Sequence, residues 1–148
     1  MNAISMANDH EDITFLAVDD DEVSIMAIKR AVKRLKIVNP VEVAYDGKEA
    51  LDILRANGTD GVRKRYIVTL DLNMPRMTGL ELLEEVRKDK ELQKQIIFVL
   101  STSDAPTDIT AAYEKNIAGY IVKENAYESM KSALEMLGAY MKIVQLPE

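Results

Sequence analysis

Five short apolar runs, each followed by a segment with helical spacing, limit most strongly how this chain can fold. The runs are residues 14–18, 41–44, 66–70, 96–100 and 119–122. Runs of this length bounded by turn signals are typical of buried strands. Strands joined by helices run parallel, with right-handed crossovers and helices on both faces of the sheet. The sequence therefore predicts an α/β fold with a doubly wound, five-stranded parallel sheet.

The helical segments show apolar residues every three or four positions. The first carries Ile25, Ile28 and Val32, and the third begins near Thr78. The fourth is expected at 107–115 and the last at 127–143. No repeat or interdomain linker is visible, so we expect one domain at 13–143, a flexible leader at 1–12 and a tail at 144–148.

Composition narrows the class of protein further. The 148 residues carry a net charge of −6, which argues against a nucleic-acid surface. Cysteine is absent, which excludes disulfides and thiolate metal sites. No apolar run approaches the roughly 20 residues that span a bilayer, and the leader has no signal-peptide pattern. We therefore expect a cytoplasmic protein with no membrane partner.

Polar side chains follow four of the predicted strands at the point where each strand ends. They are Asp19 and Asp20 after the first, Asp71 after the third, Ser101 after the fourth and Lys123 after the fifth. Ligands of open parallel sheets bind outside the carboxyl ends of the strands. We therefore expect these side chains to form one site.

The residue types at this edge indicate a particular chemistry. Crowded carboxylates repel one another unless a cation is present, and an oxygen-only site suits Mg²⁺. A lysine and a hydroxyl facing the same point suit a group with negative charge on several oxygens. Together they predict a phosphoryl group with its Mg²⁺. A carboxylate can itself be the nucleophile and form an aspartyl phosphate.

Each of these residues, taken alone, also has a simpler explanation. The acids at 19–22 suit the cap and first turn of a helix. Asp71 and Ser101 suit turns, and Lys123 suits an exposed surface. Independent helix caps would not place acids, a hydroxyl and a lysine at successive strand ends. The joint arrangement therefore favours a site.

The segments Val18-Asp19-Asp20, Leu70-Asp71-Leu72-Asn73-Met74-Pro75 and Val99-Leu100-Ser101 resemble the CheY-like receiver domain of two-component response regulators. The resemblance runs from about Ile13 to Tyr140 and implies a flavodoxin-like (βα)5 fold. It also implies a response regulator of a single domain rather than an enzyme, with a sensor histidine kinase as phosphoryl donor. Its output would be a phosphorylation-dependent change in protein contacts.

The same resemblance implies a role for each matching residue. Asp71 is implied to be the phosphoacceptor, and Lys123 to pair with the phosphate. Asp20 would bind Mg²⁺ directly, Asp19 would bind it through water, and the Asn73 carbonyl would be a further ligand. Ser101 would be the switch hydroxyl and Tyr120 the switch aromatic. One position departs from the family, because Glu124 stands where a proline in a cis peptide is usual. A cis bond before a non-proline residue costs about 2.5–4 kcal/mol, so the bond is either trans with a reshaped loop or cis under strain.

Three further segments resemble a subfamily of single-domain regulators paired with bacterial phytochrome kinases. They are the long loop at 57–65, Leu100-Ser101-Thr102-Ser103 and the tail at 143–147. A bacteriophytochrome is therefore a candidate kinase.

The last helix carries two apolar stripes. The stripe of Met130, Leu134, Leu137 and Met141 is assigned to the core. The second stripe consists of Ala133, Met136, Tyr140, Ile143 and Val144. Because a surface helix needs only one apolar face, the second predicts a homodimer through this helix and the tail. The alternative is that the tail folds back onto the domain.

Two other functions remain as alternatives. A Mg²⁺-dependent phosphohydrolase with an aspartyl nucleophile usually carries a second acid two residues later, but this position is Asn73 and no cap domain is present. A receiver that no longer takes phosphate would act only as a binding module. The complete set of acids, hydroxyl and lysine argues against that second alternative.

Overall fold

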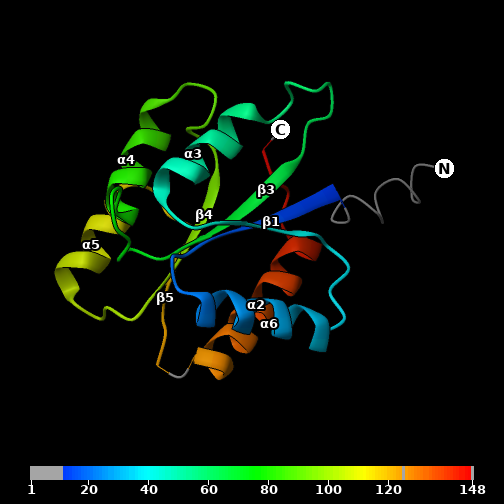
Figure 1. Ribbon diagram of the computed structural model, residues 1–148, viewed down its shortest axis with the longest axis vertical. Coiled ribbons are helices and arrows are strands. Elements are labelled where there is room, and N and C mark those ends of the chain that lie inside the picture. Colours follow the sequence, from blue (N-terminus) through cyan, green and yellow to red (C-terminus); the bar gives the residue numbers. More distant parts are fainter. Residues whose placement is uncertain (1–11, 125, 148) are drawn as a thin grey trace.

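The computed structural model describes residues 12–124 and 126–147, which form a five-stranded sheet between two layers of helices (Figure 1). The strands are β1 (Ile13–Val18), β2 (Val41–Ala44), β3 (Arg65–Leu70), β4 (Ile96–Ser101) and β5 (Gly119–Val122). They lie in the order β2-β1-β3-β4-β5, and every neighbouring pair is parallel. The predicted doubly wound fold is confirmed.

The helices that follow the strands cover the two faces of the sheet. They are α2 (Glu22–Arg34), α3 (Gly47–Ala56), α4 (Gly79–Lys88), α5 (Pro106–Glu114) and α6 (Ala126–Ile143). Figure 1 shows α2 and α6 together on one face and α3, α4 and α5 on the other. Their starts are fixed locally: the Asp21 carboxylate caps α2, and Thr78 with Glu81 forms a capping box on α4.

The core has one layer on each face of the sheet because side chains alternate along a strand. In β1, Phe15 and Ala17 pack toward α2 and α6, whereas Leu16 and Val18 pack toward α3 and α4. β1 and β3 are central and nearly completely buried. Rigid, buried strands therefore carry the two positions, 19 and 71, that the sequence assigns to the site.

In the last helix, α6, the first predicted apolar stripe is buried in the core as expected, but part of the second stripe is buried as well. Met130, Leu134, Leu137 and Met141 are all buried, as predicted. Of the second stripe, however, Ala133 is also buried, at 3% exposure. Tyr140 packs its ring edge-on against Phe98, with centroids 5.3 Å apart. Both residues therefore serve the core, because α6 lies deep enough against α2 and the sheet to bury more than one stripe.

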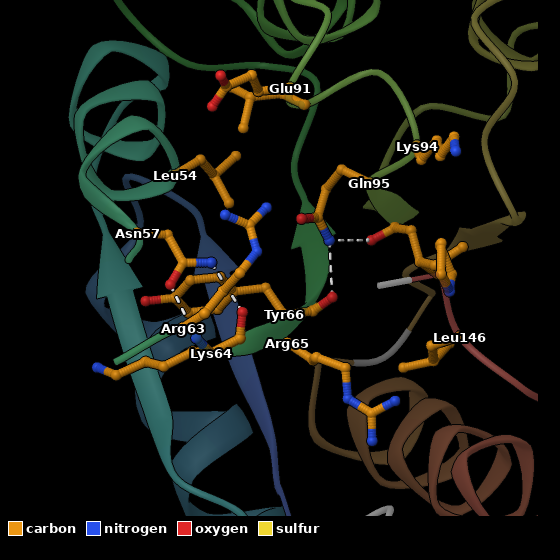
Figure 2. Close-up of a pocket in the computed structure, with 13 residues that line it drawn as sticks. Leu54, Asn57, Arg63, Lys64, Arg65, Tyr66, Glu91, Lys94, Gln95 and Leu146 are labelled. Carbon is orange, nitrogen blue, oxygen red and sulfur yellow. Dashed lines mark hydrogen bonds between the residues drawn. The ribbon is translucent and has the colours of Figure 1, made fainter. Parts of the chain in front are cut away.

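The tail folds back onto the domain, which is the alternative that the sequence left open. Leu146 packs against the same core layer as α6. Together with Pro147 it lies near the amino ends of β3 and β4 (Figure 2). Most of the predicted leader, at 1–11, and Glu148 at the tail's end lie outside the described residues. Within the described part of the chain, no helix is long and apolar enough to cross a membrane.

Candidate functional site

Three carboxylates meet at the carboxyl edge of the two central strands. The ladder continues past the strand ends, because the Asp71 N–H donates to the Val18 carbonyl at 2.9 Å and the Asp19 N–H donates to Ala44 at 3.0 Å. This pairing holds the two acids side by side. Asp19, Asp20 and Asp71 can each present an oxygen within 4.8 Å of the others. Hard oxygen donors at this spacing are the set that Mg²⁺ or Mn²⁺ requires.

The electrostatics at Asp71 are unfavourable for an ionised carboxylate. Burial, the largest cause, and the negative charges of Asp19 and Asp20 together raise the pKa of Asp71 to about 6. The Lys123 ammonium and the Asn73 N–H, which lies 3.3 Å from the carboxylate, oppose it. A cation in this cluster would relieve the repulsion, so the donor set fits a divalent metal.

Lys123 reaches the cluster from the end of β5. Its side chain is only 7% exposed, and Nζ lies 3.1 Å from the Asp19 carboxylate and 3.3 Å from the Ser24 hydroxyl. Its backbone N–H donates to the Ser101 carbonyl at 2.7 Å, which extends the β4–β5 ladder by one residue. The described residues contain no cis peptide bond, so the Lys123–Glu124 bond is trans. Without proline, the Glu124 N–H donates to the Ser129 hydroxyl at 3.1 Å.

Ser101 and Tyr120 both contact Ser103 in the loop after β4. Ser101 is fully buried, and its hydroxyl oxygen accepts the Ser103 N–H at 3.2 Å. The Tyr120 hydroxyl donates to the Ser103 carbonyl at 2.8 Å, and its ring packs against the core. Ser103 therefore links the hydroxyl at the strand end to the aromatic side chain.

The loop after Asp71 is held by a close approach of backbone to backbone. The Gly79 N–H donates to the Leu72 carbonyl at 2.9 Å. A Cβ at position 79 would lie 2.6 Å from the Asp71 carbonyl oxygen and 2.7 Å from the Leu72 Cα. Only glycine fits there, which explains why it begins α4 directly behind the phosphoacceptor candidate. The exposed Asn73 lies in this loop, beside the carboxylate cluster.

Several contacts at the site were not predicted from the sequence. Ser24 and Ser129 hold the Lys123 segment from α2 and α6, and Arg76 pairs with Asp46, the cap of α3. The spacing of Ser24 from Asp20, one helical turn, was an available signal because it places both near the start of α2. No local pattern marks the other contacts, because each joins segments far apart in the chain.

A separate cavity of about 70 Å³ lies at the other end of the sheet (Figure 2). It is lined by basic side chains from the 57–65 loop, by Lys94 and Gln95, and by Leu146 of the tail. The side-chain amide nitrogen of Gln95 donates hydrogen bonds to the backbone carbonyls of Tyr66 and Ile96. None of the predicted site residues lines this cavity.

A doubly wound sheet with an oxygen-donor cluster and a buried lysine at its carboxyl edge defines the class of the protein as a receiver-type α/β domain. Residues 15–135 match the response regulator receiver domain family, and the chain belongs to it. Receiver domains are phosphorylated by histidine kinases and generally carry signals rather than catalyse reactions.

Related proteins of known sequence cover most of the chain. The probable methanogenesis regulatory protein FilR2 of Methanothrix harundinacea is 33% identical over 125 residues, which are 84% of this chain and 81% of FilR2. The response regulator Rcp1 of Synechocystis is 26% identical over 134 residues, covering 89% of this chain and 91% of Rcp1.

Solved structures give the same result. The Mn²⁺-bound form of Rcp1 covers 91% of this chain and 99% of its own at 26% identity, with a TM-score of 0.78. The phosphorylated cyanobacterial phytochrome response regulator RcpA covers 91% of this chain and 98% of its own at 28% identity, with a TM-score of 0.80. The chain is therefore similar to phytochrome-associated response regulators, as the sequence resemblance indicated.

Proposed function

We propose that this protein is a response regulator that accepts a phosphoryl group on Asp71 from a sensor histidine kinase, in a Mg²⁺-dependent reaction. The observation that carries the proposal is the clustering of Asp19, Asp20 and Asp71 around a buried lysine. Asn73, two residues after Asp71, cannot act as a general acid. This supports a phosphoacceptor rather than a phosphohydrolase.

The transfer follows from the groups at the site. A carboxylate oxygen of Asp71 attacks the phosphorus, the bond from phosphorus to the histidine nitrogen breaks, and that nitrogen keeps the electron pair. Lys123, close to the acids, balances the negative charge of the phosphoryl oxygens. Asp19, Asp20, Asp71 and the Asn73 carbonyl would hold Mg²⁺, which supplies charge neutralisation when bound.

The change in contacts would start at the loop after β4. Ser101 turns its hydroxyl from the Ser103 N–H toward the new phosphoryl oxygens. The loop then adjusts with Tyr120, whose hydroxyl holds the Ser103 carbonyl. Such a modification shifts an equilibrium only by its different contacts in the two states. Here those contacts are the hydrogen bonds of Ser101 and Lys123.

The test is intact mass after incubation with acetyl phosphate and Mg²⁺. We expect one added phosphoryl group in the wild type and none in Asp71→Asn. Asp52→Asn, which alters an exposed carboxylate on α3, is the matched control and should behave like wild type. Unmodified wild type after trials with acetyl phosphate and with phosphorylated kinases would refute the proposal and favour a phosphate-independent binding module.

The kinase partner is proposed from the structural neighbours. RcpA is a phytochrome response regulator, and AtBRR, a bacteriophytochrome response regulator, is 29% identical with a TM-score of 0.68. A bacteriophytochrome kinase would place the reaction in the cytoplasm. Phosphoryl transfer from a purified phosphorylated bacteriophytochrome kinase to Asp71, faster than from an unrelated histidine kinase, would support this partner. Equal rates from both kinases would contradict it.

A homodimer through α6 and the tail is proposed on the corrected surface. Met136, Ile143 and Val144 are 39%, 78% and 37% exposed, which leaves an apolar strip along α6 and the start of the tail. Burial of such a strip against a second copy would stabilise a dimer. Light scattering after size exclusion should show a dimer in the wild type and a folded monomer in Ile143→Asp/Val144→Asp. A wild-type monomer in both phosphorylation states would contradict this.

A further inference from the structure

Ser24 is a buried hydroxyl outside the predicted site that contacts its lysine. It lies in the first turn of α2, is 5% exposed, and its oxygen lies 3.3 Å from Lys123 Nζ. The Ser24 hydroxyl also lies 3.2 Å from an Asp21 carboxylate oxygen and can donate its hydrogen there. Because the proton is directed to Asp21, the lone pairs of the Ser24 oxygen are available to the ammonium.

Asp21 is itself held in place by the helix that it caps. One of its carboxylate oxygens accepts the Val23 N–H at 3.1 Å, and its backbone N–H donates to the Asp19 carboxylate at 2.9 Å. The contacts therefore form a closed ring from Asp19 through Asp21 and Ser24 to Lys123, and back to Asp19. This ring fixes where the Ser24 oxygen lies.

The Lys123 ammonium has three N–H donors. One reaches Asp19 and one reaches Ser24. Among the described residues it has no third hydrogen-bond partner, and its 7% exposure leaves little room for water. With two donors committed, the direction of the third is set by tetrahedral geometry, and it remains for an incoming acceptor.

The backbone of the Lys123 segment does not by itself set the position of the ammonium. Beyond β5 the backbone is held by two hydrogen bonds, to Ser101 and to Ser129. Neither bond fixes the four side-chain torsions of a lysine, each of which has several staggered states. The position of the ammonium is therefore set by the packing of the buried side chain and by the two contacts at the ammonium itself.

We propose that Ser24 is a positioning residue for phosphoryl transfer, acting through Lys123. Its hydroxyl, with Asp19, orients the ammonium so that the third N–H meets a phosphoryl oxygen on Asp71. This inference rests on the proposed function, because it assigns the hydroxyl a role in the reaction at Asp71. Ser24 touches neither the phosphoryl group nor the metal-ligand oxygens; it acts on the lysine alone.

The test is a double-mutant cycle of Ser24→Ala and Lys123→Ala, with acetyl phosphate as donor and saturating Mg²⁺. A hydrogen bond to a charged group is worth enough to slow transfer about tenfold when it is lost. We expect that decrease for Ser24→Ala in the wild-type background. In the Lys123→Ala background the same substitution should change the rate by less than about twofold, because the lysine that it positions is gone.

Two readouts separate positioning from a structural role. The Mg²⁺ concentration that gives half the maximal rate should not change in Ser24→Ala, whereas disturbed acids would raise it. The ¹⁵N signal of the Lys123 ammonium should be sharp in the wild type and broadened in Ser24→Ala, a measurement that needs no turnover. Thr14→Val removes another buried hydroxyl, at the opposite end of β1, and should leave both readouts unchanged.

The outcomes are distinct from those for the proposed function. Wild type that takes no phosphoryl group from any donor would refute the proposed function, and the role of Ser24 would be refuted with it. Wild type that is phosphorylated, with Ser24→Ala at the same rate, would overturn the role of Ser24 alone. An equal loss of rate in both backgrounds, or an unchanged ammonium signal in Ser24→Ala, would also overturn it.

Discussion

The two ends of the sheet contrast in how their polar groups are satisfied. At the carboxyl end, three carboxylates gather around one buried lysine. At the amino end, the Arg87 guanidinium donates to four backbone carbonyls, those of Lys115, Asn116, Gln93 and Gln95. The Asn39 amide donates there to the carbonyl of Ile13. The carboxyl end therefore has more negative charge than its one lysine balances, whereas at the amino end the backbone carbonyls are paired with side-chain donors.

The contrast separates reactivity from stability. At the carboxyl end, burial and the neighbouring acids raise the pKa of Asp71, as is common at functional sites, and this is where we propose that a cation and a phosphoryl group bind. Satisfied carbonyls at the amino end fix α4, β4 and the turn before β5 to one another. Substitutions at the two ends should therefore have opposite consequences for activity and for the free energy of unfolding.

The largest effect on stability is expected from Arg87→Ala. Loss of four charge-assisted hydrogen bonds leaves carbonyls unpaired, and we expect a loss of about 3–4 kcal/mol in the free energy of unfolding. Phosphoryl incorporation per folded molecule should stay within about twofold of wild type. Urea unfolding measures the first quantity and intact mass the second. Lys88→Ala, which removes only exposed ion pairs, is the control. An Arg87→Ala protein that is as stable as wild type but is not phosphorylated would contradict the assignment of stability to the amino end and reactivity to the carboxyl end.

Gly79→Ala should affect both properties, because the added Cβ would meet the Asp71 carbonyl oxygen at 2.6 Å. We expect a loss of about 2–3 kcal/mol from overpacking and slower phosphorylation, since the Asp71 loop must shift. Gly138→Ala is the matched control, because a Cβ at that position in α6 meets nothing within 4 Å. It should leave the rate of phosphorylation unchanged. Equal behaviour of the two variants would contradict the close approach.

Asp71→Asn should remove phosphorylation yet stabilise the metal-free protein at pH 7.5. The folded-state pKa of Asp71 is raised to about 6 from 3.8, so the folded protein binds the proton more tightly than the unfolded chain. The ionised carboxylate therefore lowers stability, and the cost appears as pH rises through about 4 to 6. Allowing for partial solvent exposure, we expect a gain of about 1–2 kcal/mol at pH 7.5.

The gain in stability of Asp71→Asn can be checked by its dependence on pH. At pH 3.5, below both pKa values, Asp71 is largely protonated in the folded and unfolded states, and the advantage of the Asp71→Asn variant should be largely lost. Melting curves at the two pH values, without metal, measure the difference. A stabilisation that is the same at both would mean that the charge of Asp71 is not its source.

The smallest effect is expected from Arg76→Ala. The Arg76 side chain is 75% exposed although its partner Asp46 is buried. Asp46 also keeps its bond from the Glu49 N–H at 2.8 Å. We expect a loss below about 1 kcal/mol and little change in phosphorylation, both measurable by urea unfolding and intact mass. A large loss of activity would show that this ion pair holds the Asp71 loop.

Local patterns made the fold predictable, and with it the meeting of the three acids and Lys123 at one edge of the sheet. Strand and helix periods, the turn at Pro75 and Gly79, and the rule that ligands lie at the carboxyl strand ends placed Asp71 beside Asp19 from the sequence alone. Lys123 is expected at the same edge because it comes directly after the fifth strand of a parallel sheet. These features depend on sterics and side-chain polarity over a few residues, which the sequence contains directly.

Tertiary packing alone decided the remaining features. Contacts such as Ser24 with Lys123, 99 positions apart, have no local signature. The depth at which α6 lies, which buries Ala133 and Tyr140, depends on the volume that α2 and the sheet leave between them. The raised pKa of Asp71 likewise reflects burial and charges brought from other strands. The sequence determined which groups could meet at the edge of the sheet; packing and long-range electrostatics decided which of them touch and how they are charged.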